Sequence, residues 1–338
     1  MSSSPILPRK IHRRSLLSAG LSLGAGMLAA PLGVHAQDKF PSRPITLMVP
    51  FPAGGSVDLM ARTYSEPLSR VLGVPVIIDN RPGAGGSVAS QLVARAKPDG
   101  YTLVVSSQSS HLANPLTQPK LGYDPIKDFE NITILGRQPN VLVVHSSLPI
   151  RTVKEFVDYA KKNPGKLNYG SGGVGSMGQL NVEMFKAVTG IYTTHIPYRG
   201  GTQLITAVLA NEVQFILDNL VIMLPHIQAG KVRALAVAAD TRLPQLPDVP
   251  TMAEVGYPQL NLTSWTGLAA PGGTPDAVVQ TLYKAVRQAA TAPAMVANLK
   301  ERGVFVPEEM PPAAFEQMMA ERMVKFGDVV RRAGITAE

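Results

Sequence analysis

The sequence predicts an α/β protein whose two domains enclose a ligand cleft. Short apolar runs alternate with segments of helical period along most of the chain, which is the pattern of parallel sheets covered by helices. At 338 residues the chain is longer than one average hydrophobic core, so two domains are expected. The chain is expected to cross between the domains twice, near 132–142 and 260–270. Two crossings make a hinge, and a hinge makes a cleft that can close.

The first α/β unit follows from apolar runs separated by helical periodicity. Strands are expected at Ile45–Val49, Val76–Ile78 and Leu103–Val105, with helices at Val57–Leu72 and Ser87–Ala96 between them. This β-α-β-α-β order implies a parallel sheet with right-handed crossovers. Pro67 lies inside the first helical pattern and should kink or split that helix.

A second α/β unit begins at the apolar run Val141–Val144. Thr152 with Glu155 three residues later forms a capping box, which predicts a helix start. The sequence Asn163-Pro164-Gly165 ends that helix. Further strands are expected near Leu167–Tyr169, Thr194–Ile196, Phe215–Leu217 and Ala234–Ala238, with helices at 176–189, 202–210 and 220–229.

The C-terminal segment is too helical to form a domain alone. It opens with an extended stretch, Leu262–Ala269, that contains the single tryptophan, Trp265. Helices are expected at 275–290, 293–302 and 312–333. We therefore expect this segment to return to the first domain. The predicted domains are 37–138 with 264–338 for domain 1, and 139–263 for domain 2.

The first 36 residues have the features of a cleavable export signal. A basic head at Arg9–Arg14 precedes the apolar stretch Ser15–Leu32, and Val34-His35-Ala36 offers small residues for cleavage after Ala36. The pair Arg13-Arg14 resembles a twin-arginine signal, although a general secretory signal fits nearly as well. A retained membrane anchor is the alternative, but the stretch is weakly hydrophobic. A periplasmic protein is expected.

Charge and cysteine content exclude several classes of function. The formal net charge is +8, but removing the first 36 residues leaves 28 basic and 24 acidic residues. No basic run with interleaved aromatic residues remains, so nucleic acid is not an expected partner. The chain has no cysteine, which excludes disulfides, thiolate metal sites and cysteine nucleophiles.

Two glycine-rich turns occupy similar positions in the two units. The first, Pro50–Ser56, follows a strand and precedes a helical pattern, and Gly170–Ser176 does the same in the second unit. A strand, a turn and a helix start in this order leave backbone N–H groups unpaired and direct them at whatever lies above. Two such turns facing each other across a cleft would hold a small anion.

Nucleotide binding is a weaker interpretation of the second turn. The segment Gly173–Gly178 matches G-x-G-x-x-G after a strand. However, no acid lies between Glu183 and Glu212, so the ribose-binding carboxylate of a dinucleotide site is missing. Neither glycine turn is followed by G-K-[S/T], which a triphosphate site requires.

Metal and hydrolase chemistry are also weakly supported. The histidines after the leader are widely spaced and form no metal-ligand motif. His111 after Ser106–Ser110 could suggest a serine hydrolase, but the sequence lacks a G-x-S-x-G elbow. We therefore expect no catalytic residue, no metal and no cofactor.

Several polar residues follow predicted strands and have both structural and ligand-binding interpretations. Asp58 is either a helix-dipole partner or an acceptor for a ligand amine or hydroxyl. Asp218 follows a strand at the end where α/β sheets place their ligands. Tyr198–Thr202 lies at a similar strand end, where Thr202 is also a helix N-cap candidate. For the run Asp79–Gly86, a tight structural turn is preferred to ligand contact.

Ordered motifs along nearly the whole chain after the leader resemble the Bug receptors, the extracytoplasmic solute-binding proteins of tripartite tricarboxylate transporters. The motifs include Pro50-Phe51-Pro52-Ala53-Gly54-Gly55 with Asp58, Asn80-Arg81-Pro82-Gly83-Ala84-Gly85-Gly86, Pro98-Asp99-Gly100-Tyr101-Thr102-Leu103, Pro197-Tyr198-Arg199-Gly200-Gly201, Pro247-Asp248-Val249-Pro250-Thr251 and Ser264-Trp265. One departure is Gly178-Gln179-Leu180, where many relatives carry a serine-rich stretch ending in His-Leu. The motifs are specific to the family and not to one ligand.

The resemblance implies a type II periplasmic-binding-protein fold, with two α/β domains joined by two crossing strands and a cleft between them. It implies a small carboxylate or amino-acid-like ligand, held largely by backbone N–H groups and ordered water. On that pattern the ligand-binding residues are Phe51, Ala53, Gly54, Gly55, Asp58 and Ser107 from the first domain, and Ser171, Ser176, Tyr198, Thr202 and Asp218 from the second. The implied partners are the membrane permease subunits of the transporter, and the receptor itself is expected to be a monomer.

Two other functions remain alternatives to transport. The same fold could present its ligand to a signalling protein instead of a permease. An exported enzyme acting on a small carboxylate is the less favoured alternative, because the sequence offers no nucleophile–base pair and no metal set.

Overall fold

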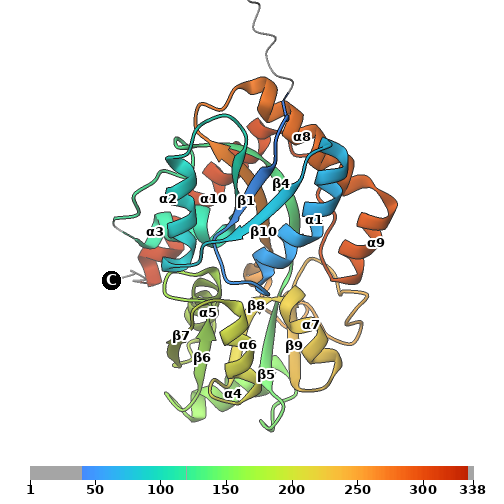
Figure 1. The fold of residues 1–338 in the computed structure, drawn as a ribbon. Helices are drawn as coiled ribbons and strands as arrows, with labels where there is room; N and C mark the ends of the chain where they lie inside the picture. Colours follow the sequence, from blue (N-terminus) through green and yellow to red (C-terminus); the bar gives the residue numbers. More distant parts are fainter. Residues whose placement is uncertain (1–39, 119, 334–338) are drawn as a thin grey trace, which may run out of the picture. The chain divides into compact units, whose positions relative to one another are not determined.

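The computed structural model describes residues 40–118 and 120–333, and these residues form two five-stranded sheets (Figure 1). The first sheet contains β1 (Ile45–Val49), β2 (Val76–Asn80), β3 (Thr102–Ser107), β4 (Phe129–Gln138) and β10 (Ser264–Pro271). The second contains β5 (Asn140–His145), β6 (Asn168–Ser171), β7 (Thr194–Pro197), β8 (Phe215–Asn219) and β9 (Val232–Ala238). We call each sheet with its helices a lobe. Both lobes belong to one compact unit.

The two sheets share one plan. The first has the order β2-β1-β3-β10-β4 and the second the order β7-β6-β8-β5-β9. In each sheet the first three strands are parallel. The fourth strand is antiparallel to both of its neighbours, and it follows directly on a segment of the other lobe. The chain crosses at Pro139, between β4 and β5, and returns at Thr263, just before β10.

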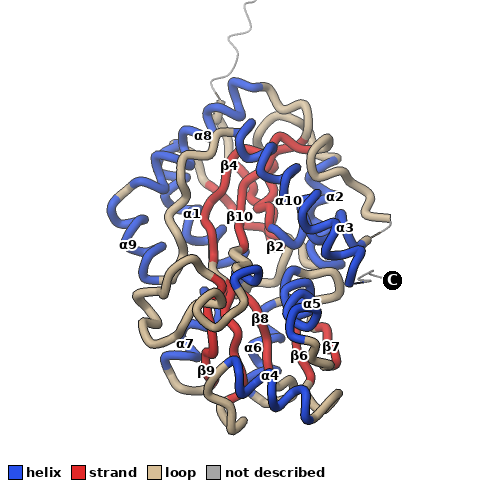
Figure 2. The backbone as a smooth tube through the Cα atoms, turned by 180° about the vertical axis from the view of Figure 1, so that it is seen from behind, coloured by secondary structure: helices blue, strands red, loops and turns tan. Residues whose placement is uncertain are grey.

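Helices cover both sheets. They are α1 (Ser56–Leu72), α2 (Ser87–Ala94), the π-helical turn η2 (Ser109–Ala113), α3 (Asn114–Thr117), α4 (Val153–Lys162), α5 (Met177–Thr189), α6 (Gly201–Leu209), α7 (Leu220–Gln228), α8 (Asp276–Thr291), α9 (Pro293–Glu301) and α10 (Pro312–Ala333). Figure 2 shows α10 lying over the first sheet, where it packs against β4. The C-terminal segment thus joins the first lobe, as the sequence predicts. None of the helices within residues 40–118 and 120–333 is both long and apolar enough to cross a membrane.

Every strand and helix predicted from periodicity is present within a few residues. The capping box is also formed, because Thr152 Oγ1 accepts a hydrogen bond from Glu155 N at 3.1 Å. The sequence analysis missed β4 as a strand and the helical turns of 109–117. The predicted export signal lies outside the described residues, and the exact domain boundaries stay a prediction.

The prediction that Pro67 splits the first helix is wrong. Helix α1 runs without interruption from Ser56 to Leu72 with Pro67 inside it. Tyr64 and Leu68, on either side of the proline, are 0% and 3% exposed. Burial of this apolar face on both sides of Pro67 offsets the lost backbone hydrogen bond, which costs about 3 kcal/mol in an isolated helix.

The Tyr64 hydroxyl also forms a hydrogen bond with a residue in a β-bulge of the first sheet. The pairing of β10 with β4 passes from Gly136 to Ile134 and skips Leu135, so the bulge leaves Leu135 outside the ladder. The Tyr64 hydroxyl donates to the Leu135 carbonyl oxygen at 2.6 Å in the buried core. This bond therefore ties α1 to the strand that leads into the second lobe.

We expect Tyr64→Phe to lower the free energy of unfolding by about 1–3 kcal/mol, because it leaves the buried Leu135 carbonyl without a donor. Urea denaturation followed by circular dichroism measures the change. Tyr283→Phe is the matched control, because the Tyr283 hydroxyl makes only a 3.5 Å bond to Glu309 at the surface. Equal effects of the two substitutions would contradict the role given to Tyr64.

Candidate functional site

A small cavity of about 60 Å³ lies between the two lobes. Its wall is formed by residues at the carboxyl ends of β3 and β8, by the first residues of the helices that follow the parallel strands, and by β10. This edge is where open α/β sheets bind their ligands. Five of the predicted ligand-binding residues line it: Phe51, Gly55, Ser107, Ser176 and Asp218.

Two helices begin at the cavity with free backbone amides. The N-cap residues of α1 and α6 are Gly55 and Gly200, which have no side chain to accept a helix N–H. Within residues 40–118 and 120–333, the amides of Ser56, Val57 and Gly201 donate to no other residue. All three residues line the cavity. Together with the helix dipoles, these amides favour an anion.

Helix α5 begins at the same cavity but is capped. The Ser176 hydroxyl accepts from Gln179 N at 3.5 Å. Ser109, from the first lobe, accepts from Met177 N at 3.1 Å through its hydroxyl. Among the described residues, the Gly178 amide has no acceptor. A serine of one lobe therefore caps a helix of the other and leaves one amide free at the cavity.

Three buried side-chain atoms of cavity-lining residues have no hydrogen-bond partner in the described part of the chain. They are Gln108 Oε1, Asn219 Oδ1 and Trp265 Nε1. Buried polar groups in folded proteins are almost always paired with protein or with ordered water. These atoms indicate that water or a ligand in the cavity completes the hydrogen bonding of the wall.

Asp218 is the one ionisable residue among those that line the cavity. Its Oδ1 accepts from Asn219 N at 2.7 Å and from Asn219 Nδ2 at 3.2 Å. Burial raises the pKa of the Asp218 carboxyl above its ordinary value, against the opposing effect of the bonds from Asn219. Gly178 permits this packing, because a Cβ there would lie 2.5 Å from Asp218 Oδ2. Among the described residues, the cavity wall therefore has no basic side chain and one carboxyl whose pKa is raised.

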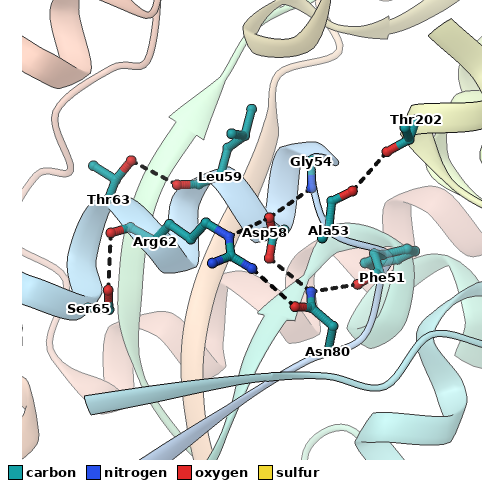
Figure 3. Close-up of polar contacts among 10 residues, drawn as sticks. All are labelled: Phe51, Ala53, Gly54, Asp58, Leu59, Arg62, Thr63, Ser65, Asn80 and Thr202. Carbon is teal, nitrogen blue, oxygen red and sulfur yellow. Dashed lines mark hydrogen bonds and ion pairs between the residues drawn. The ribbon is translucent and has the colours of Figure 1, made fainter. Parts of the chain in front are cut away.

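Asp58, which the sequence left open between two roles, is held inside the first lobe (Figure 3). Its Oδ2 accepts from Gly54 N at 2.8 Å and from Arg62 Nε at 2.9 Å, and its Oδ1 accepts from Asn80 Nδ2 at 2.9 Å. Burial alone would raise its pKa, but these hydrogen bonds and the Arg62 charge hold the pKa of Asp58 below its ordinary value. Asp58 thus shapes the first glycine turn, and its contact with a ligand stays a prediction.

The second glycine turn is shaped in a similar way by Ser171. Its hydroxyl donates to the Gly173 carbonyl oxygen at 2.9 Å and lies 2.7 Å from His195 Nε2. The His195 ring stacks on Tyr169 with 4.8 Å between ring centroids. Ser171 does not line the cavity, so the structure gives it a supporting place behind the turn.

The lobes are in direct contact beside the cavity. The Thr202 hydroxyl donates to the Ala53 carbonyl oxygen at 2.9 Å (Figure 3). Gly200 has a φ of +98°, and a Cβ there would lie 2.7 Å from Pro52 Cδ. Glycine is therefore required at position 200 both for its backbone conformation and for this close approach. The predicted residues Ala53, Gly54 and Thr202 belong to this contact and not to the cavity wall.

A wide groove of about 1260 Å³ lies outside the cavity and shares Phe51, Gly172 and Gly200 with it. Tyr198, from the predicted set, lines this groove, as do the residues of the turn 82–86. Lys120 and Arg199 lie along it and place positive charge at the approach to the cavity. Such charges raise the local concentration of anions and speed their association.

Of the residues that suggested a hydrolase, Ser107 and Ser109 line the cavity, whereas Ser110 and His111 lie away from both openings. Ser110 Oγ is 2.9 Å from His111 Nδ1, but both residues are fully buried and neither lines the cavity or the groove. Burial lowers the pKa of His111 to about 3, which keeps the ring neutral. Within the described residues, no cluster of His, Asp and Glu could hold a metal ion.

Sequence reasoning missed part of the cavity wall. Ser109, Gly201 and Asn219 stand next to predicted residues or at helix starts, so the strand–turn–helix pattern could have identified them. Gln138 and Thr266 also line the cavity and are joined by a 3.0 Å hydrogen bond from Gln138 Nε2 to Thr266 Oγ1. Gln138 and Thr266 come together only because β4 pairs with β10, and no local sequence pattern predicts that pairing.

Comparison with known proteins agrees with this geometry. The profile described as "Tripartite tricarboxylate transporter family receptor" matches residues 60–335. Protein BugT of Bordetella pertussis is 33% identical over 322 residues, which cover 95% of this chain and 98% of BugT. A UPF0065 protein of Cupriavidus necator is 35% identical over 325 residues, which cover 96% of this chain and 97% of the relative.

Solved structures share the fold over nearly their whole length. The periplasmic binding protein BugD has a TM-score of 0.84 at 32% identity and covers 88% of this chain and 100% of its own. An R. palustris protein with adipate has a TM-score of 0.85 at 35% identity, covering 88% and 99%. MatC from Rhodopseudomonas palustris with bound malate has a TM-score of 0.82 at 35% identity, covering 86% and 100%. The predicted fold and the predicted family resemblance are confirmed.

We expect Asp218→Asn to stabilise the protein increasingly as the pH rises. Below the ordinary carboxyl pKa both folded and unfolded chains hold the proton, so the substitution has little effect. Above it the unfolded chain loses the proton first, and the wild type loses about 1.4 kcal/mol for each pH unit until the raised folded pKa is passed. Denaturation at pH 4 and pH 8 measures this, with the exposed Asp248→Asn as control. A difference that shrinks as pH rises would contradict it.

Proposed function

We propose that this chain, which belongs to the family of tripartite tricarboxylate transporter receptors, captures a small carboxylate in the cavity between its lobes. One observation carries the proposal. Among the described residues, the backbone amides of Ser56, Val57 and Gly201 are unpaired, come from opposite lobes and belong to one cavity wall that has no basic side chain. Binding in this receptor proceeds without chemical turnover of the ligand.

The backbone amides offset the main free-energy cost of binding, which is the removal of a carboxylate from water. A buried carboxylate without hydrogen bonds is strongly destabilised, so every oxygen needs donors. Backbone amides at helix starts are fixed in place before the ligand arrives and carry the dipole of their helix. Donors from both lobes stabilise the closed form of the complex, because only the closed arrangement brings them to one ligand.

Asp218 limits which chemical groups of the ligand can lie beside it. A charged carboxylate beside a second carboxylate would be repelled in a water-poor cavity. The ligand group next to Asp218 is therefore a hydroxyl or ammonium, or Asp218 is protonated in the complex. Either arrangement fits a hydroxy acid, an amino acid or a simple dicarboxylate. The adipate and malate of two relatives fall within these classes and support this range.

The cavity volume indicates that ligand entry requires the lobes to separate. The cavity measures about 60 Å³, against the ~10–15 Å³ that one water requires, so in this arrangement it holds only a few waters. The contacts between Thr202 and Ala53 and between Met177 and Ser109 must open first. The described arrangement is thus the closed form, and we propose that the closed form is what a membrane permease recognises.

We further propose that the chain is exported to the periplasm and that the signal is removed after Ala36. N-terminal sequencing of the protein recovered from a periplasmic fraction tests both statements. A mature N-terminus at Gln37 supports the proposal, whereas an intact leader in the membrane fraction contradicts it.

A thermal-shift screen over mono-, di- and tricarboxylates, amino acids and aromatic acids should identify at least one stabilising acid. A ligand at 100 times its Kd adds about 2.7 kcal/mol to the free energy of unfolding. The neutral amides of the same acids are matched controls and should give no shift. If none of the acids stabilises the purified protein, or if one of them is turned over, the proposal fails.

Ser56→Pro tests the role of the backbone amide at the start of α1. Position 56 is the first residue of the helix, where proline is well tolerated, and Gly55 before it is extended (φ −76°, ψ 168°). The substitution removes one free N–H from the cavity wall, so we expect the best acid to bind about tenfold more weakly. Ser56→Ala is the control, because it removes the hydroxyl and keeps the amide. Equal affinities of the two variants would contradict the amide mechanism.

Binding of a simple dicarboxylate, which has neither an amine nor a hydroxyl, should take up a proton at Asp218. The incoming negative charge raises the pKa of Asp218 further, so the affinity should fall as the pH rises. Isothermal titration calorimetry in two buffers of different ionisation enthalpy measures the uptake. Asp218→Asn should bind the same acid without uptake, and an unchanged uptake in that variant would assign the proton to another group.

A further inference from the structure

A third opening, a pocket of about 250 Å³, lies at the segments through which the chain crosses between the lobes. We call it the hinge pocket. It is lined by residues of both crossing segments, by α10 of the first lobe and by loops of the second lobe. Its polar residues include Arg137, Asp240, Asn261, Thr263 and Arg322.

The crossing segments separate the hinge pocket from the ligand cavity. Gln138 and Ser264 line the cavity, whereas their chain neighbours Arg137 and Thr263 line the hinge pocket. Successive side chains of an extended strand point to opposite faces, so one strand contributes to both openings. The hinge pocket is therefore a distinct site that shares its wall with the cavity.

Two arginines give the hinge pocket its charge. Arg322 extends from α10, and Arg137 stands at the end of β4. Within residues 40–118 and 120–333, neither guanidinium forms an ion pair with a carboxylate. Arg322 Nη1 makes only a long bond, 3.4 Å, to the Thr263 carbonyl oxygen. Burial, and then the neighbouring Arg137 charge, lower the pKa of Arg322.

Among the described residues, Asp240, the acid in the hinge pocket, forms no ion pair with either arginine. The Asp240 carboxylate accepts a hydrogen bond from the Asn261 side chain instead. Two like charges that are partly withdrawn from water repel each other, and an anion between them removes the repulsion. Arginine's planar group suits this role, because it donates in pairs to carboxylate, phosphate or sulfate oxygens.

We propose that the hinge pocket binds a small oxyanion through Arg137 and Arg322. The site is separate from the ligand cavity, and its charge is supplied by side chains and not by backbone amides. At about 250 Å³ the pocket has room for a phosphate or a short dicarboxylate with several waters. Because the wall of the pocket includes both crossing segments, the bound anion lies on the hinge side of the two lobes.

Anion binding is measured on the full chain after the leader, as the midpoint of thermal unfolding in increasing phosphate, sulfate or succinate. Sodium chloride at equal ionic strength is the reference. We expect at least one of the three oxyanions to raise the midpoint in a saturable way. Comparison of the three arms distinguishes an inorganic anion from a carboxylate, and no shift beyond chloride in any arm overturns the proposal.

Arg137→Gln and Arg322→Gln should each weaken this binding at least tenfold. Arg151→Gln is the control, because Arg151 is an exposed arginine outside the pocket. Ser56→Pro should retain the anion-induced shift, since it alters only the ligand cavity, and this separates the present proposal from the proposed function. A folded arginine variant with wild-type affinity overturns it.

Crystals of the wild-type protein soaked in selenate provide a test that needs no variant. Anomalous scattering locates the selenium directly. An ion within hydrogen-bond distance of both guanidinium groups supports the proposal. Selenate found only in the ligand cavity or on the outer surface overturns it.

Discussion

The exchange of one strand between the two sheets is the constraint on which the rest of this structure depends. Strand β5 continues from β4 across Pro139 and inserts between β8 and β9, and β10 returns to insert between β3 and β4. Each inserted strand is antiparallel to its neighbours, so each lobe is completed by chain that arrives from the other. The carboxyl ends of the parallel strands thereby meet at one place, and the helix starts that follow them meet there as well.

An anion site built from backbone amides has consequences that a site built from arginines does not have. Amides at a helix start are neutral, so they add no repulsion to the empty cavity and need no acid to balance them. They also leave room for a carboxyl such as Asp218, which a basic cavity would hold in its charged form. In the binding mode that we propose, the amides contact the carboxylate and Asp218 contacts a second group of the ligand, so the cavity can distinguish acids by that second group.

The sequence predicted the features that depend on neighbours along the chain. Strand–turn–helix patterns located the glycine turns and Asp218, and a capping box located the start of α4. Features that depend on particular side-chain contacts and on burial were not predictable. Asp58 lies in the predicted helix, but its hydrogen bonds to Gly54, Arg62 and Asn80 determine that its carboxylate holds the first glycine turn. The prediction for Pro67 considered only the isolated helix, whereas the burial of Tyr64 and Leu68 keeps the helix continuous.

The two anion sites that we propose differ in what they require of the protein. In the cavity the donors lie on helix starts of separate lobes, so their positions relative to each other change when the lobes open. In the hinge pocket Arg137 lies on a crossing strand that belongs to the first sheet, and Arg322 packs against that sheet on α10. The two guanidinium groups therefore stay near each other in every arrangement of the lobes. An anion there is affected by closure only through Asp240 and the neighbouring loop of the second lobe, so it biases the hinge weakly. The cavity ligand, in contrast, depends on closure to bring together donors from both lobes.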